Sequence, residues 1–359
     1  MIAKDRNLNI DVAKGIGIIC VSIYHFVFRY ENSLSDKILC ELIWLLMPLF
    51  FIISGYLDKN RKKSFSQKIF YRIKALLVPT LKYTVIWLLI GGIYCVIFHD
   101  YSSRDFFRDV IQTYLRPEFS NFVIPEWGVG GILFESLSAV WFIWSMMFTY
   151  FIFYLIADYV RYDSKKLIFT VLILLFLGII VYDFGEKISW SLTVIPIYAA
   201  LMLCGSYFAQ IHDFKFNFLI AITAAVIHFV MYQFFGTDFV FANSLGTVGR
   251  WSVITFFLQT FIGIYAFMAL CSALNKKTKL ISKFFIYIGQ NSLIFLVFHG
   301  AFGLIYSDVL HTFIKLSQEY WYIDNITPET FCKSLAVCFL SILSCFVICF
   351  LKDKFKEQK

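Results

Sequence analysis

The chain alternates between long apolar runs and short charged segments, and this alternation predicts its fold class. A helix that crosses a bilayer needs about 20 mostly apolar residues, and ten runs come close to that length. Only the stretch DFGEKISW separates the fifth run from the sixth. The sequence therefore predicts an all-α, polytopic integral membrane protein with about ten transmembrane helices. The predicted spans are residues 9–29, 38–57, 74–98, 132–157, 165–183, 191–210, 216–235, 251–274, 284–306 and 331–351.

Basic residues are distributed unevenly between the loops on the two sides of these spans. Twenty-one lysines and arginines fall in the loops of one side and nine in those of the other. Because cytoplasmic loops carry an excess of Lys and Arg, both termini are predicted to be cytoplasmic. The two longest loops, about 99–131 and 305–330, then lie outside. In the first, YSSRDFFRDVIQTYL suits a helix in the membrane interface, either as a cap over a site or as a passive connector.

Composition agrees with a membrane protein and excludes several other classes. The chain is 60% hydrophobic and 16% charged, whereas soluble domains carry about 25% charged residues. The net charge of +8 comes from loops between apolar runs, so no nucleic-acid partner is expected. The nine cysteines form no CxxC pair and no zinc spacing, so we expect packing roles and no metal. The charged start, MIAKDRN, lacks a following cleavage site, which favours a retained first span over a signal peptide.

Three ionisable residues interrupt the first apolar run, IDVAKGIGIICVSIYHF. Such a group inside a membrane costs several kcal/mol unless it is paired or hydrated, so each is a candidate functional residue. Asp11 and Lys14 are placed to pair on one helix face, although Lys14 is also close enough to the inner surface to snorkel. His25 follows Lys14 by eleven residues, close to three full turns, so the two share a stripe about 16 Å apart along the axis. A cation and a base aligned across the bilayer fit a reaction whose donor enters from one side of the membrane and whose acceptor lies on the other. The alternative is that His25 is a structural histidine.

The end of the second run and the following loop hold further candidates. Ser54 and Gly55 allow close helix approach, and no GxSxG motif supports Ser54 as a nucleophile. The next loop, DKNRKKSFSQKIFYRIKALLVP, is the most basic in the chain. This loop either sets the membrane topology and contacts anionic lipid, or it captures a phosphorylated donor. Pro79 is expected to kink the next helix or to open a cavity there.

Later runs add further polar and aromatic residues, and a structural role is favoured over a functional one for Trp141 and His228. Trp141 fits an aromatic belt at the membrane interface, and the unflanked His228 is interpreted as structural. In IGQNSLIFLVFHG, Asn291 and Ser292 are expected at the entrance of a helix, with His299 about eight residues deeper.

Several of these segments follow one another in the order found in a known family. A basic residue, ten residues and then a histidine, from Lys14 to His25, resembles the opening of the acyltransferase family 3 membrane proteins. The later segments are each similar to one of the family's segments, and together they span about 300 of the 359 residues. These segments are FFIISGYL, KIFYRIKALLVP, AVWFIWSMMF and IGQNSLIFLVFHG.

The resemblance implies transfer of an acyl group, usually acetyl, from cytoplasmic acyl-CoA to a hydroxyl of a cell-surface or lipid-linked carbohydrate. It also implies that His25 is the key catalytic residue and that Lys14 belongs to the same motif. Histidine suits a general base near neutral pH, so we expect His25 to deprotonate the acceptor or to carry the acyl group briefly. We further assign Asp11 to catalysis, Lys14, Lys68, Arg72 and Lys74 to the donor, and Ser54, Trp141 and His299 to the acceptor.

The sequence departs from the family pattern at two points. Lys14 stands where many members have arginine, and the motif tolerates either residue. The family's paired-arginine loop signature is not intact, because Lys68, Arg72 and Lys74 occupy that region. The resemblance therefore leaves open which of these three contacts the donor.

The expected organisation is one transmembrane domain, residues 1–351, followed by a basic cytoplasmic tail, 352–359. Some family members carry an extra C-terminal esterase-like domain. The sequence stops at the tail LKDKFKEQK, so this chain is expected to act alone or with partner proteins of a glycan pathway. Its expected location is the cytoplasmic (inner) membrane, among membrane lipids, with acetyl-CoA as donor and a carbohydrate as acceptor. A transporter or flippase is the alternative function, although no Gly/Pro-interrupted pair of spans in the two halves supports it. A structural subunit of a polysaccharide machine is a third interpretation.

Overall fold

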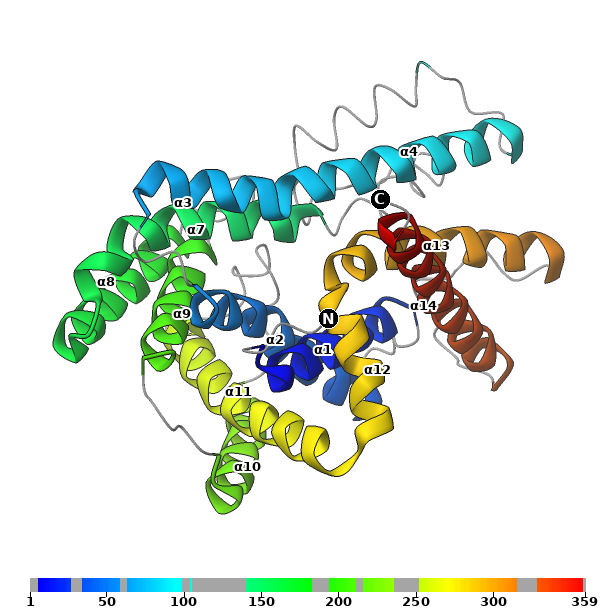
Figure 1. The fold of residues 1–359 in the computed structure, drawn as a ribbon. Coiled ribbons are helices and arrows are strands. Elements are labelled where there is room, and N and C mark those ends of the chain that lie inside the picture. The colour runs from blue at the N-terminus through cyan, green and yellow to red at the C-terminus, as the bar shows by residue number, and fades with distance from the viewer. Residues whose placement is uncertain are drawn as a thin grey trace.

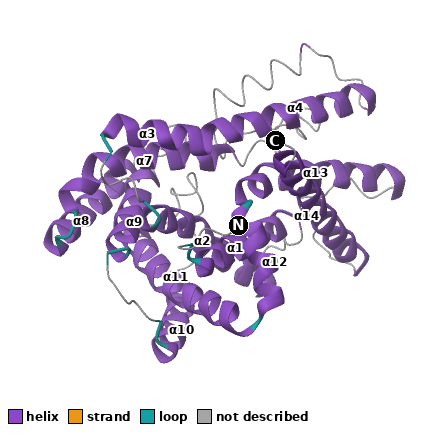
Figure 2. Cartoon of the chain, viewed as in Figure 1, coloured by secondary structure: helices purple, strands orange, loops and turns teal. Residues whose placement is uncertain are grey.

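The structure, a computed structural model, describes residues 6–26, 34–58, 63–98, 104, 140–182, 194–210, 216–235, 252–314 and 328–357. The regular elements in these ranges are all helical (Figure 1 and Figure 2), which confirms the predicted all-α class. Apart from Arg104, the predicted interface helix lies outside the described residues. The elements are α1 (Leu8–Phe26), α2 (Leu34–Tyr56), α3 (Phe65–Arg72), the π-helical turn η1 (Ile73–Leu77), α4 (Val78–Phe98), α7 (Val140–Val160), α8 (Ser164–Tyr182), α9 (Ile195–Phe208), α10 (Phe218–Phe235), α11 (Ser252–Lys277), α12 (Lys279–Gln290), α13 (Ser292–Ile314) and α14 (Pro328–Glu357).

Several of the described helices are long and apolar enough to cross a membrane. Four pass this test alone, and α12 and α13 pass it as a pair bent by 83°. A multi-pass membrane protein is therefore confirmed, whereas the number of ten spans and the cytoplasmic termini stay predictions. The four segments are Phe142–Val160, Ser164–Val181, Val253–Lys277 and Cys332–Phe355, and the shorter apolar helices are Leu45–Tyr56, Ile195–Phe208 and Phe218–Phe234.

The predicted ninth span, 284–306, is not one straight helix. The chain bends at Asn291, whose side-chain amide donates a hydrogen bond to the carbonyl oxygen of Tyr287 at 3.1 Å. This bond satisfies one of the carbonyl groups that the end of α12 leaves without a helical partner. The next helix begins at Ser292, as expected for a helix entrance.

Two pairs of central helices approach each other closely at glycines. A Cβ atom on Gly15 of α1 would collide with the backbone of α12, and one on Gly289 of α12 would collide with the backbone of α1. Gly55 of α2 and Gly205 of α9 meet in the same reciprocal way. Small residues let helix backbones approach closely in membrane proteins. These contacts hold α1 and α2 in the middle of the fold (Figure 1), where the candidate site residues begin.

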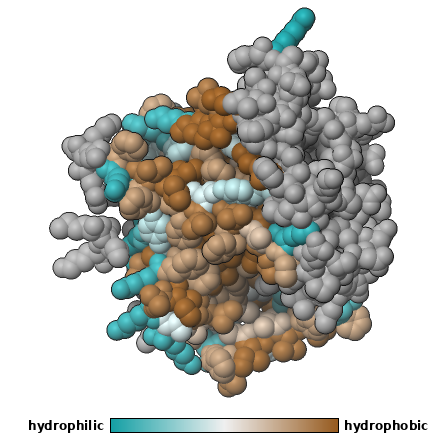
Figure 3. All heavy atoms as spheres, turned by 90° about the vertical axis from the view of Figure 1, so that its right-hand side faces the viewer, coloured by the Kyte–Doolittle hydropathy of each residue, from teal (hydrophilic) through white to brown (hydrophobic). Residues whose placement is uncertain are grey.

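Helices at the edge of the fold expose apolar side chains. Phe169 and Phe176 of α8 and Phe218 and Phe234 of α10 are all exposed, whereas most of α9 is buried. Figure 3 shows a broad apolar area with hydrophilic residues along its margins. An exposed apolar face of this extent is stable next to lipid and costly in water, in agreement with a membrane protein.

Candidate active site

The first part of the site is the start of α1, where Asp11 is buried. The Asp11 carboxylate accepts two hydrogen bonds from Arg6, one from Nε at 2.5 Å and one from Nη2 at 2.9 Å. The pairing of Asp11 with Lys14 that the sequence suggested does not form, and Lys14 makes no hydrogen bond or ion pair with the described residues. Arg6 precedes the helix and folds back over its first turn, offering a planar fork that matches a carboxylate. The hydrogen bond to Asp11 raises the pKa of Arg6.

Polar contacts also fix the start of α1 against α11. The side chain of Asn9 donates to the Ser272 hydroxyl at 3.4 Å and accepts from the Asn275 amide at 2.8 Å. Together with the glycine contact to α12, these bonds determine the position of Asp11 and Lys14. Because α1 is unbroken to Phe26, the shared stripe of Lys14 and His25 holds for the backbone.

Two predicted site residues have described backbones only. His25 lies in the last turn of α1 and Trp141 in the first turn of α7, and the side chains of both lie outside the described part of the chain.

The second part of the site is a buried cluster between the end of α2, α3 and α7. Arg72 donates from Nη2 to Oδ1 of Asp58 at 2.9 Å and from Nε to the Tyr154 hydroxyl at 2.8 Å. That hydroxyl donates in turn to Oδ1 of Asp58 at 2.9 Å. The ring of Tyr150 covers one face of the guanidinium, with 4.2 Å between Cζ and the ring centroid. Burial works to lower the pKa of Arg72, but the contacts with Tyr154 and Asp58 contribute to a pKa above its ordinary value, so Arg72 is charged.

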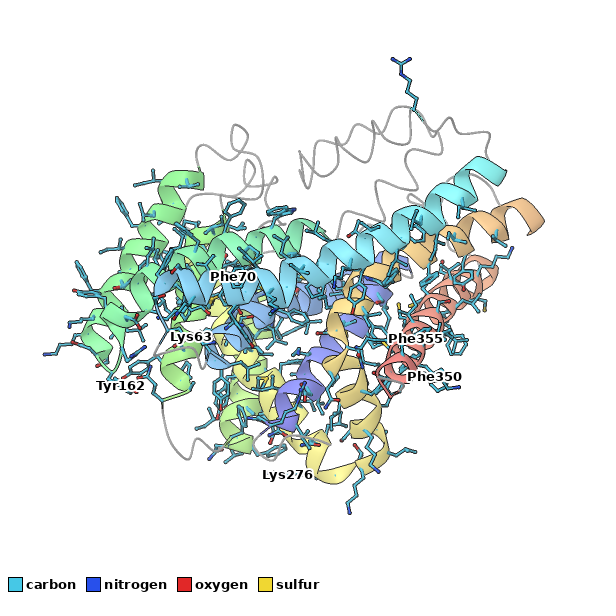
Figure 4. All side chains as sticks on the ribbon, turned by 45° about the horizontal axis from the view of Figure 1, so that its top comes forward. Lys63, Phe70, Tyr162, Lys276, Phe350 and Phe355 are labelled. Carbon is cyan, nitrogen blue, oxygen red and sulfur yellow. The ribbon has the colours of Figure 1, made fainter. Side chains whose placement is uncertain are left out.

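Lys68 lies one turn before Arg72 on the same face of α3 and also has an acidic partner. Its Nζ donates to Asp158 of α7 at 2.9 Å, and its side chain is only 3% exposed. The Asp158 carboxylate also accepts from Arg161 at 2.6 Å. On the other face of α3, Phe70 is exposed (Figure 4).

Local sequence explains why α3 presents these two cations together. Ser64 starts the helix with a reciprocal pair of hydrogen bonds. The Ser64 hydroxyl accepts from the backbone amide of Gln67, and the side-chain oxygen of Gln67 accepts from the backbone amide of Ser64. This capping box sets the register that brings residues four apart onto one face. After Arg72 the helix widens to η1, where the Val78 amide donates to the Ile73 carbonyl. Pro79 follows directly and donates no backbone bond, and the widened turn lies next to it; the expected kink stays a prediction.

Ser54 belongs to this cluster as well, through α7. Its hydroxyl donates to the sulfur of Met146 at 3.8 Å and lies close to Tyr150 of the same helix. Ser54, which the sequence assigned to the acceptor, therefore lies in the same cluster as Arg72 and Lys68, which it assigned to the donor. Lys74 lies in η1, is exposed, and forms no ion pair with the described residues.

The remaining histidine predictions fall on other helices. His299 of α13 is buried, and its Nδ1 lies 2.8 Å from the carbonyl oxygen of Phe295. A carbonyl oxygen only accepts, so Nδ1 carries the proton. His228 of α10 donates in the same way to Gln259 of α11 at 3.0 Å, which agrees with the structural role expected for it.

Sequence reasoning missed Asp58, Tyr150, Tyr154 and Asp158. Three of these were detectable as a stripe, since Tyr150, Tyr154 and Asp158 recur every four residues along α7. Asp58 was detectable as an acid placed between an apolar run and the most basic loop. Among the described residues no group of three metal-ligating side chains occurs.

Comparison with known proteins identifies the family. A family model described as an acyltransferase domain, acyltransferase 3, matches residues 7–350, nearly the whole chain. No curated protein and no solved structure gives a significant match. The match covers both the Lys14–His25 helix and the cluster around Arg72. The chain belongs to the acyltransferase 3 family of membrane acyltransferases.

Proposed function

We propose that the protein transfers an acyl group, with acetyl as the expected one, from cytoplasmic acyl-CoA to a carbohydrate hydroxyl at the far side of the membrane. The observation that carries this proposal is the continuous α1, which holds Lys14 and His25 three turns apart in a chain of this family. His25 acts as the general base for the acceptor hydroxyl, or receives the acyl group and passes it on.

The donor is proposed to bind where α2, α3 and α7 meet. Coenzyme A carries phosphates, and arginine forks and lysine charges bind phosphate oxygens. Arg72 keeps N–H groups that bond none of the described residues, and Lys74 is exposed two residues further along the chain. Lys68 is buried against Asp158, so we assign it to bracing α3 against α7.

The experiment is acetyl transfer by membrane vesicles, with labelled acetyl-CoA added to the cytoplasmic side and surface glycans analysed by mass spectrometry. The His25→Ala variant is expected to lose at least about 100-fold in rate, the lower end of what a general base contributes. The His228→Asn variant is the matched control, because it removes a membrane histidine with a structural partner, and it should keep transfer. Wild-type transfer by His25→Ala would disprove the assignment.

A transporter is separated from the enzyme by ligand binding. The bend between α12 and α13 is the type of broken helix that transporters use around a substrate. Thermal stabilisation of the detergent-solubilised protein by acetyl-CoA, together with acetyl-CoA turnover, supports the enzyme. Neither effect at millimolar acetyl-CoA would favour transport.

A further inference from the structure

The cluster around Arg72 contains an ion pair that is unusually well buried. The side chains of Asp58 and Arg72 are 6% and 13% exposed. Taking both charges out of water costs free energy that their attraction only partly returns, so a buried ion pair is weak evidence for stability alone. A role in fixing the geometry of one of the two groups accounts better for its presence.

The hydrogen bonds determine which part of Arg72 is fixed. Its Nε and Nη2 lie along one edge of the guanidinium, and this edge is held by the Tyr154 hydroxyl and by Asp58, which are themselves bonded. Tyr150 covers one face of the same group. These contacts set the rotation and the plane of the guanidinium, so the direction of its remaining edge is set too.

The remaining edge is the fork formed by Nη1 and the second N–H of Nη2. Arginine has five N–H donors, and in the described part of the chain Arg72 uses two of them. The free fork has the spacing that binds two oxygens of a phosphate. Lys74, two residues further on, is exposed and points away from Arg72, so it adds only a longer-range charge.

We propose that Asp58, with Tyr154, is a positioning residue that aims the free fork of Arg72 at a phosphate of the acyl donor. This inference rests on the proposed function and deepens it, since it names the groups that prepare the donor site. Asp58 does not touch the donor; it acts through Arg72 and prevents the guanidinium from turning away.

The test compares Asp58→Asn and Tyr154→Phe with wild type, measuring KM for acetyl-CoA, kcat and melting temperature. Each variant is expected to raise KM on the order of ten-fold, the value of one hydrogen bond to a charged group, with kcat within about two-fold. In an Arg72→Lys background, which lacks the fork, neither substitution is expected to raise KM further. Asp353→Asn is the matched control: it removes the carboxylate that accepts from Tyr287 at 3.2 Å, away from Arg72, and should leave KM unchanged.

The outcomes separate this inference from the proposed function. Wild-type turnover of acetyl-CoA combined with an unchanged KM in Asp58→Asn and Tyr154→Phe overturns the positioning role and leaves the function standing. A KM increase that persists in the Arg72→Lys background also overturns it, because Asp58 would then act independently of the fork. If the wild type neither binds nor turns over acetyl-CoA, both proposals fail.

Discussion

Two regions of the molecule combine the same three types of residue and use them differently. At the start of α1, Arg6 pairs with Asp11 while Lys14 lacks a partner among the described residues. Between α2, α3 and α7, Arg72 pairs with Asp58 while Lys74 is the lysine that has no ion-pair partner in the described part of the chain. The first arginine is 42% exposed and bonds a residue five positions away, whereas the second is 13% exposed and joins α3 to α7 and to Asp58, just after the end of α2.

The difference teaches which arginine is replaceable. Arg6 can turn to water if its partner is lost, so its pair acts as a local clamp on the first turn of α1. Arg72 has little access to water, and its loss leaves a buried carboxylate without a cation. The exposure of the two lysines follows the reverse order. Lys14, in the region of the more exposed arginine, is partly buried on the helix that carries His25, while Lys74, in the region of the buried arginine, is exposed.

The largest expected effect follows from removing each arginine. Arg72→Ala is expected to lower the free energy of unfolding by about 3–5 kcal/mol, because Asp58 remains buried and unpaired. Arg6→Ala, the matched control, is expected to cost less: Asp11 is also buried, at 4% exposure, but Arg6 is 42% exposed, so its removal opens the Asp11 carboxylate to water. Reversible unfolding in mixed micelles measures both values.

A second substitution tests the reason for this difference. Replacing Asp58 by Asn in the Arg72→Ala variant removes the stranded charge and should recover part of the lost stability. Equal costs for the two arginines would show that the two ion pairs are equivalent, and no recovery in the double variant would show that the stranded charge is not the cause of the lost stability.

Much of the fold was predictable from the length of the apolar runs. The runs 216–235 and 251–274 correspond closely to α10 and α11, because a membrane helix must satisfy its backbone within itself. The bend at Asn291 was not predictable, since it depends on a side chain closing α12 and on Lys352 of α14, which donates to the Asn291 side chain. Helix α3 was also missed, because a basic segment of eight residues carries no signal of a span.

The part of the candidate site whose residues lie on a single helix was predictable from the sequence. The spacing of Lys14 and His25 required only a continuous helix, and α1 supplies it. The choice of Arg6 over Lys14 as the partner of Asp11 depends on the chain folding back before the helix begins. The closure of Arg72 on Asp58 and Tyr154 depends on how α2, α3 and α7 meet, which no local pattern specifies.

An intermediate effect is expected from the unpaired lysine of the first region. Lys14→Ala should lower kcat/KM about 10- to 100-fold, the cost of one bond to a charged group. Lys14→Arg should restore most of it, because the family motif accepts either cation. Lys82→Ala, which removes an exposed lysine of α4, is the control and should leave the rate unchanged. Wild-type kinetics for Lys14→Ala would remove Lys14 from the proposed path and leave the first region a purely structural clamp.

The smallest effect is expected from the unpaired lysine of the second region. Lys74→Ala should raise KM for acetyl-CoA by about two- to five-fold without changing the melting temperature, because an exposed charge attracts phosphate through screened solvent. Added salt should reduce this difference, whereas it should change the effect of Asp58→Asn much less, since buried charges are screened less. Lys276→Ala, at the exposed end of α11 (Figure 4), is the matched control for a lost surface charge. Lys68→Ala is expected to lower the melting temperature, because Lys68 braces α3 against α7. If Lys74→Ala lowers it too, then Lys74 also braces the fold, and the fork of Arg72 must hold the donor phosphate without help from Lys74.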